Sequence, residues 1–206
     1  MEKGTIVFDL GGVIINLNVP RCVSNFKRLM PEENIRNILG IDDEGEGVVA
    51  VSAATKQLMH DYEYGNISTD EFLSTLQEYC FAGTTIEQIR AAWLSMLDEL
   101  PKERLDYIRH LRAEGYRTIL LSNSNELHWD PIWEQYHLGD YFDAVFASQN
   151  LHKAKPNKEI FEHVVREAKV NEAIYVDDLE KNRKAGEQFA GWKTVSSIEE
   201  LKSLIP

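Results

Sequence analysis

Cysteine is scarce in this sequence, and long apolar runs are absent from it. Cys22 and Cys80 are the only cysteines among 206 residues. A disulfide framework is therefore not expected, and a reducing, cytoplasmic environment is. No apolar run is long enough to span a bilayer. Asp9 interrupts the apolar run near the N-terminus, so we expect no signal peptide either.

Positive charge is also in short supply. Lysine and arginine number 22 against 34 aspartates and glutamates, which gives a formal net charge of −12. Such a surface repels nucleic acid and anionic membranes, and we expect neither as a partner. It mildly repels an anionic substrate as well. Binding of a phosphate would therefore need a metal ion and a few well-placed donors.

Short apolar runs alternate with segments of helical spacing. The runs lack polar alternation, which is typical of strands buried on both faces and predicts a parallel sheet. Two intervening segments carry apolar stripes at helical spacing, and Gly115 is well placed to end the first helix. The predicted strands are residues 5–8, 116–121, 142–147, 173–176 and, more weakly, 192–195. The stripes are Leu105, Ile108 and Leu111, then Ile160, Phe161, Val164, Val165 and Ala168.

The stretch between the first two predicted strands, about residues 19–100, is far longer than a simple crossover. It reads as helical. Pro31-Glu32-Glu33 resembles a helix start, and the segments 68–71 and 84–87 match the capping box, with Ser68 and Thr84 in the capping position. Glu44-Gly45-Glu46-Gly47 is typical of a turn between helices.

These patterns predict an α/β fold with two parts. Residues 1–17 and 100–206 would form a Rossmann-like core with a parallel sheet. Residues 18–99 would form an inserted helical cap, a bundle of about four helices above the sheet. The sequence does not fix the oligomeric state, because apolar helix faces pack equally well within a chain or between chains.

Three predicted strands end in polar residues, at Asp9, Ser122-Asn123 and Asp177-Asp178. Ligands of open parallel sheets bind beyond the carboxyl ends of the strands, where the strand order reverses. A helix that follows such a strand also directs its first N–H groups towards an anion. The alternative is structural: Asp9 could be a helix cap, and the Asp pair could form an Asx turn.

Four motifs resemble those of the haloacid dehalogenase-like hydrolase superfamily. Phe8-Asp9-Leu10-Gly11-Gly12-Val13-Ile14 is similar to the first motif, and Leu120-Leu121-Ser122-Asn123 to the second. Lys155-Pro156 with the following helix resembles the third, and Val176-Asp177-Asp178 with Asn182 the fourth. The likeness covers the whole chain, since the insert resembles that superfamily's first type of cap. Within the superfamily, the first two motifs look closest to the bacterial α-D-glucose-1-phosphate phosphatase branch.

The resemblance implies a role for each motif residue. Asp9 would attack phosphorus and become an aspartyl phosphate, which water then hydrolyses. Ser122 and the Asn123 amide would hold phosphate oxygens. Lys155 would neutralise charge on Asp9 and on the transferring group. Lys153 competes for that role, but Lys155 directly precedes Pro156 and a predicted helix start.

A magnesium ion is implied by the same motifs. Asp178 would bind Mg²⁺ directly, with Asp177 nearby, and the Asp9 carboxylate and Gly11 carbonyl would complete the protein ligands. The ion would screen repulsion between the attacking carboxylate and the phosphate. The expected activity is thus a Mg²⁺-dependent phosphoric monoester hydrolase acting on a small phosphorylated metabolite, with a sugar phosphate favoured.

Gly11 departs from the superfamily pattern. Most phosphatases that the chain resembles have a second aspartate here, which protonates the leaving group and later deprotonates water. Such a group contributes about 10²–10⁴-fold, or roughly 3–5 kcal/mol. Its absence should matter least for a good leaving group, such as that of a sugar 1-phosphate or an acyl or aryl phosphate. A metal-ordered water or His128 could be its substitute.

Three other interpretations remain. A metal-independent 2-haloacid dehalogenase would also lack the second aspartate, although the Asp177-Asp178 pair argues against it. Gly11 permits a non-catalytic, degenerate member, although the retention of Asp9, Ser122, Lys155 and Asp178 disfavours it. Transfer of the phosphoryl group to another sugar would share the first half-reaction.

Overall fold

The computed structural model describes residues 3–39 and 53–205. The turn predicted at Glu44–Gly47 lies outside the described residues. The five strands found there are all parallel, in the order β3-β2-β1-β4-β5, which confirms the predicted Rossmann-like sheet. They are β1 (Gly4–Phe8), β2 (Tyr116–Ser122), β3 (Ala144–Ala147), β4 (Ala173–Val176) and β5 (Lys193–Val195).

The strand order reverses at the centre of the sheet. The chain runs outward from β1 through β2 to β3, then crosses back to β4 on the other side of β1 and continues to β5. The connections that follow β1 and β4 therefore leave in opposite directions, and a crevice opens between their carboxyl ends. Phe8 of β1 is paired with Val176 of β4, so both strands end at the same level.

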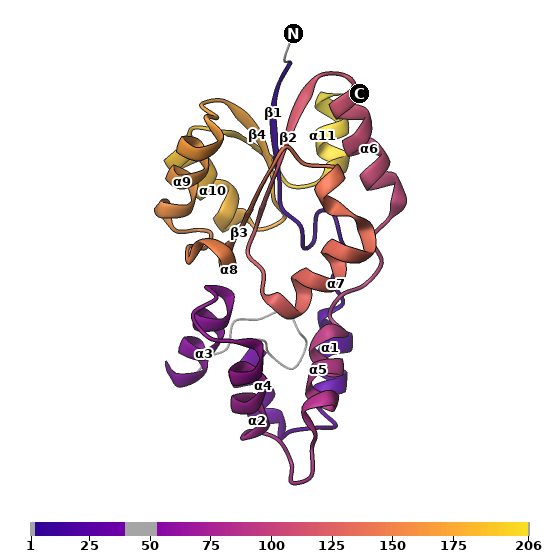
Figure 1. Cartoon of the computed structure of the whole chain (residues 1–206), viewed down its shortest axis with the longest axis vertical. Coiled ribbons are helices and arrows are strands. Elements are labelled where there is room, and N and C mark those ends of the chain that lie inside the picture. The colour runs from indigo at the N-terminus through magenta and orange to yellow at the C-terminus, as the bar shows by residue number, and fades with distance from the viewer. Residues whose placement is uncertain (1–2, 40–52, 206) are drawn as a thin grey trace.

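Helices cover both faces of the sheet (Figure 1). Alternate strand residues point to opposite faces: Phe8 and Val176 join the cluster beneath α6, while Val7 and Tyr175 join the cluster beneath α9. The helices of the first face are α6 (Lys102–Ala113), α7 (Glu126–Tyr136) with the 3₁₀ turn η1 (Leu138–Asp140), and α11 (Ile198–Leu204). Those of the second are α8 (Ser148–Leu151), α9 (Lys158–Ala168) and α10 (Glu180–Ala190).

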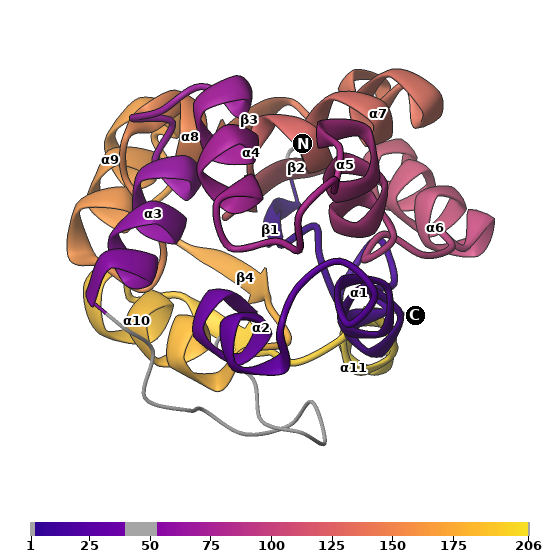
Figure 2. The same ribbon diagram turned by 90° about the horizontal axis from the view of Figure 1, so that it is seen from below.

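Between β1 and α6 the chain forms five described helices, where about four were predicted for the cap. They have their own apolar cluster, centred on Phe26, Phe72 and Trp93. This cap lies beyond the carboxyl ends of the strands, as Figures 1 and 2 show from two directions. The domain boundaries at residues 17/18 and 99/100 stay a prediction. The cap helices are α1 (Val19–Phe26), α2 (Glu32–Leu39), α3 (Ala53–Glu63), α4 (Thr69–Gln77) and α5 (Ile86–Leu94).

Both predicted capping boxes begin cap helices, but one was placed wrongly. Ser68 caps α4 together with Glu71, as expected. The prediction of Thr84 as the second cap was wrong by one residue, because Thr85 caps α5 and pairs with Gln88. Neighbouring threonines offer the same hydroxyl, and Gln replaces Glu equally well in this motif. The sequence pattern alone therefore could not decide between them.

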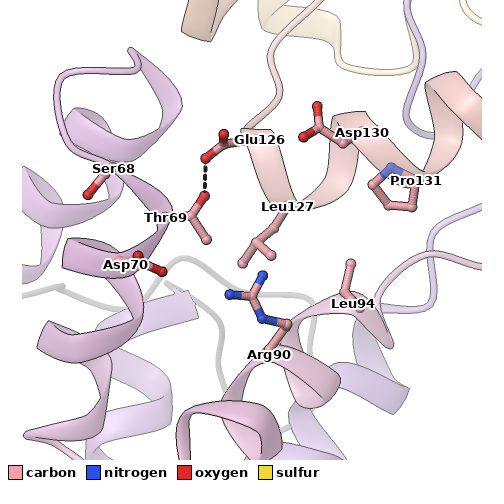
Figure 3. Close-up of a pocket in the computed structure, with 9 residues that line it drawn as sticks. All are labelled: Ser68, Thr69, Asp70, Arg90, Leu94, Glu126, Leu127, Asp130 and Pro131. Atoms are coloured by element: carbon pink, nitrogen blue, oxygen red, sulfur yellow. Dashed lines mark hydrogen bonds between the residues drawn. The ribbon is translucent and has the colours of Figure 1, made fainter.

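The first turn of α7 fixes the cap to the core. Leu127 is buried in the cap cluster, and its backbone N–H donates to the Tyr62 hydroxyl at 3.2 Å. The Thr69 hydroxyl donates to the Glu126 carboxylate, as Figure 3 shows. A pocket of about 530 Å³ lies beside this contact, between α4, α5 and α7. It is lined by none of the motif residues, so it is a feature of the junction between cap and core.

Candidate active site

The carboxylates predicted from separate motifs do meet at the central crevice. Asp9 follows β1, and Asp177 and Asp178 follow the neighbouring strand β4. The Asp9 N–H donates to the Val176 carbonyl at 2.9 Å, which extends the pairing of the strands by one step. One carboxylate oxygen from each of the three side chains lies within 4.8 Å of the others. This spacing is suitable for ligands that share one cation.

Lys155 reaches the same point from the loop before α9. Its ammonium lies 2.9 Å from Asp9 Oδ1 and 2.7 Å from Asp177 Oδ2, and its side chain is fully buried. It also donates to the Leu121 carbonyl at 3.0 Å. The competitor, Lys153, instead donates to the Leu151 carbonyl at 3.2 Å. The lysine at the carboxylate cluster is therefore Lys155.

The reason first given for preferring Lys155, a helix start at Pro156, was wrong, because α9 begins only at Lys158. Asn123 holds the lysine instead. Its Nδ2 donates to the Lys155 carbonyl and its Oδ1 accepts from the Lys155 N–H, each at 2.8 Å. This reciprocal pair joins the end of β2 to the loop that carries the lysine. The Asn123 side chain thus positions Lys155.

The Asp177 carboxylate accepts hydrogen bonds from four groups of the protein. Besides Lys155, it accepts from the Tyr175 hydroxyl, the Leu179 N–H at 3.0 Å and Asn182 Nδ2 at 3.1 Å. It has no exposed surface. Asp178, in contrast, is exposed at the mouth of the crevice. Asp9 and Asp178 are therefore the better candidates for direct metal ligands, and Asp177 orients Lys155. Sequence reasoning assigned Tyr175 no role, since it lies within a continuous apolar run that predicted only a buried strand.

Glycine at positions 11 and 12 makes room for neighbouring side chains. Gly12 has φ +75°, and a Cβ there would lie 2.7 Å from Asp178 Cγ. At position 11 a Cβ would lie 3.1 Å from Leu17 Cδ1. The loop from Asp9 thus passes close to Asp178 only because Gly12 lacks a side chain. Ser122 is buried at the end of β2 and donates to the Asn123 carbonyl at 3.2 Å.

The electrostatics of the cluster favour an added cation. Burial raises the pKa of Asp9 to about 7, against the opposing effect of Lys155. Burial and the charge of Asp177 also raise the pKa of Asp178. Burial alone would lower the pKa of Lys155, but Asp9 and Asp177 outweigh it and raise that pKa. Three carboxylates thus lie together, and the one ammonium beside them contacts only Asp9 and Asp177. Their oxygens are the donors that Mg²⁺ prefers, so the residues present fit a divalent ion.

His128 does not reach the crevice. Its ring stacks on Trp93 of the cap, with centroids 5.4 Å apart. Nε2 lies 3.1 Å from the Trp93 carbonyl, and Nδ1 lies 3.4 Å from Asn125 Nδ2. Burial lowers its pKa to about 4. His128 is therefore a neutral, structural histidine of the junction between cap and core, and it cannot substitute for the acid missing at Gly11.

A cap residue that the motifs did not indicate does approach the site. Glu63, the last residue of α3, lines a cleft of about 400 Å³ together with Lys155. Its local sequence has no motif signal, because its position depends on how the cap rests on the core. The cleft also includes Lys56 and His60 from the same face of α3.

Comparison with known proteins agrees with this geometry. The sequence profile of haloacid dehalogenase-like hydrolases matches residues 3–189. The chain belongs to this family of hydrolases. It is 32% identical over 197 residues to a D-ribitol-5-phosphate phosphatase of Bacteroides thetaiotaomicron, covering 92% of this chain and 89% of that protein.

Solved structures give the same result. A family enzyme from B. thetaiotaomicron, crystallised with magnesium and inorganic phosphate, is similar with a TM-score of 0.75 and 31% identity over 94% of this chain and 93% of that one. A hydrolase from Porphyromonas gingivalis has a TM-score of 0.80 and 30% identity over 98% of this chain and 97% of that one. A dehalogenase has a TM-score of 0.64 but only 16% identity, over 100% of this chain and 98% of that one, and shows the fold alone.

Proposed function

We propose that this protein is a Mg²⁺-dependent phosphatase that hydrolyses a small sugar or polyol phosphate through an aspartyl phosphate on Asp9. The observation that carries the proposal is the meeting of Asp9, Asp178 and Lys155 at the crevice between β1 and β4. A nucleophile, an open carboxylate for a cation and a fixed ammonium are what transfer of a phosphoryl group to a carboxylate requires. The similarity to a ribitol-5-phosphate phosphatase over most of the chain supports it.

Each residue would have a distinct part in the reaction. Asp9 attacks phosphorus, and the bond between phosphorus and the ester oxygen breaks. Lys155, held by Asp177 and Asn123, keeps Asp9 oriented and neutralises charge on the transferring group. The Ser122 hydroxyl and the Asn123 backbone N–H would donate to phosphate oxygens, since the Asn123 side chain is engaged by Lys155.

Asp9, Asp178 and the Gly11 carbonyl would hold Mg²⁺, which when bound screens the repulsion between carboxylate and phosphate. Family enzymes crystallised with magnesium support this ion as the cofactor. Asp177 would orient Lys155 rather than bind the ion, because its oxygens already accept hydrogen bonds from the protein.

The substrate has two candidates. The motif resemblance favours a sugar 1-phosphate such as α-D-glucose 1-phosphate, with a good leaving group. The curated relative suggests the 5-phosphate of a linear polyol, in which the leaving oxygen belongs to a primary alcohol. We favour the second class, because the relative matches the chain from the core through the cap.

A cytoplasmic location and the absence of nucleic acid and membrane partners stay predictions. No described helix is long and apolar enough to cross a membrane.

A phosphate-release assay tests the proposal. Purified protein is offered ribitol 5-phosphate, glucose 1-phosphate, nucleotides and small organic phosphates, with Mg²⁺ and with EDTA. We expect release only with Mg²⁺ and none from Asp9→Asn. Chloride release from a 2-haloacid in EDTA would instead identify a dehalogenase. If no phosphate is released from any compound, the degenerate-member interpretation holds.

A further inference from the structure

We propose that Glu63, from the cap, supplies the proton to the leaving oxygen and then takes a proton from the attacking water. This inference rests on the proposed phosphatase function and assigns the acid–base step that position 11 does not provide. It depends on where α3 ends relative to Lys155, and on how firmly that end is held.

Position 11 cannot contribute an acid in this chain. It is a glycine, and a Cβ built there would lie 3.1 Å from the Leu17 side chain. The Leu17 side chain thus lies against the point from which a side chain at position 11 would start. An acid for the leaving group must come from another segment.

Glu63 is the carboxylate that the cap brings to the phosphate site. It lines the same cleft as Lys155, whose side chain touches the nucleophile Asp9. The Glu63 carboxyl lies next to the Asn123 side-chain amide and near the Lys155 charge, and Asn123 holds the lysine that contacts Asp9. We infer that a substrate with its phosphate beside Asp9 and Asn123 brings its bridging ester oxygen towards this carboxyl group. This is the point at which an acid–base group must act.

The end of α3 is fastened to the core at several points. The Glu63 carbonyl accepts from Ser148 Oγ at 2.8 Å. The Tyr64 carbonyl lies 2.7 Å from His152 Nδ1. The Tyr64 hydroxyl accepts a hydrogen bond from Asn157 Nδ2 at 2.6 Å. Figure 2 shows α3 beside α8 and α9 on this side of the cap. Glu63 is thus held in place beside the loop that carries Lys155, as a positioned catalytic group requires.

The surroundings of Glu63 suit a group that exchanges protons. Burial raises the pKa of its carboxyl. The charges that oppose this shift belong to Lys181 of α10, Lys155 of the core loop and His60 of α3, and the Asn123 amide adds a weaker effect. A carboxyl group with a raised pKa is a better acid–base catalyst near neutral pH than one with its ordinary value.

The protons balance over the two half-reactions. In the first, Asp9 forms a bond to phosphorus while the ester P–O bond breaks, and the Glu63 proton moves to the departing alkoxide, which leaves as an alcohol. In the second, the Glu63 carboxylate removes a proton from water as that water attacks phosphorus. The bond from Asp9 to phosphorus breaks, inorganic phosphate leaves, and both Glu63 and Asp9 return to their starting forms.

The test compares Glu63→Gln with the wild type on ribitol 5-phosphate and on p-nitrophenyl phosphate, whose phenolate leaves without a proton. With the alkyl phosphate we expect turnover to fall by about 10²–10⁴-fold. With the aryl phosphate we expect a burst of about one p-nitrophenol per enzyme, because the aspartyl phosphate forms but is hydrolysed slowly. Wild-type activity on ribitol 5-phosphate should decline at high pH, because Glu63 then loses the proton it donates. This decline should be absent from Glu63→Gln.

Two further variants separate catalysis from structure. Glu63→Asp keeps a carboxyl group and should recover part of the alkyl-phosphate activity without a burst. Glu78→Gln changes an exposed glutamate at the end of α4 and should behave as the wild type. No loss on ribitol 5-phosphate, or a loss on p-nitrophenyl phosphate without a burst, with an unchanged pH profile in Glu63→Gln would overturn the inference. An inactive wild type would instead defeat the proposed function.

Discussion

The Lys155 ammonium lies 2.7 Å from the Asp177 carboxylate, and neither side chain has any exposed surface. The pair is part of a closed network, because Tyr175, Leu179 and Asn182 also donate to Asp177. Asp177 thereby fixes the lysine 2.9 Å from Asp9. Charges removed from water in this way are tolerated only when their partners are complete. The pair therefore links the stability of the core directly to the position of Asp9, the proposed nucleophile.

Asp177→Asn should destabilise the protein strongly. The substitution leaves the buried ammonium with one partner, and removal of one member of a buried ion pair costs about 3–5 kcal/mol. Urea unfolding followed by circular dichroism measures the loss. As a control, Asp106→Asn breaks exposed pairs with Lys102 and Arg109 and should change stability far less. Equal effects from the two substitutions would contradict the role given to Asp177.

Gly12→Ala should abolish activity even though a methyl group is the only addition. The new Cβ would collide with the Asp178 carboxylate and would occupy a residue with φ +75°. Gly191→Ala is the matched control, because Gly191 has φ +70° and nothing within 4 Å of the added atom. Both variants share the backbone strain, about 1 kcal/mol or more, but only Gly12→Ala displaces Asp178. Steady-state phosphate release distinguishes them, and equal activities would argue against a close approach.

Much of the core could be predicted because its determinants are local. The apolar runs 5–8 and 173–176 are continuous in the sequence, and the strands they form end at Asp9 and Asp177 as expected. Parallel strands place their carboxyl ends at one edge, so the meeting of these residues followed from the fold class. The strand predicted at 142 begins instead at Ala144, because Phe142 and Asp143 form its approach.

The remainder of the site depends on contacts between distant segments. Asn123 and Lys155 are 32 positions apart in the sequence, and no pattern in either segment reveals their pairing. Nothing in the sequence distinguishes Glu63 from the other glutamates of the cap. Its position follows from the contact between the end of α3 and Ser148. The role of the Asn123 amide as a phosphate ligand was a family inference and stays a prediction, while the Asn123 side chain pairs with Lys155. Such features appear only when packing is known.

Asp178→Asn should remove most of the stabilisation that Mg²⁺ confers. An ion that binds only the folded protein adds about 2.7 kcal/mol when its concentration is 100 times Kd. Thermal unfolding with increasing Mg²⁺ should therefore raise the Tm of the wild type and leave that of Asp178→Asn nearly unchanged. Asp130→Asn, at an exposed acidic position on α7, should keep the wild-type response. A Tm increase in Asp178→Asn as large as in the wild type would exclude Asp178 as a ligand.

Stability should fall between pH 6.5 and about pH 4, partly because of His128. Burial lowers its pKa in the folded protein to about 4 from an ordinary value of 6.5. The unfolded chain therefore binds more protons in this range, and the stabilisation is present above pH 6.5 and lost as the pH falls towards 4. Between pH 7.5 and pH 5 this histidine should account for about 2 kcal/mol. The free energy of unfolding measured at both pH values should differ less in His128→Gln than in the wild type. The same difference in both proteins would mean that the ring is charged in the folded state, which its stacking on Trp93 and its contact with the Trp93 carbonyl argue against.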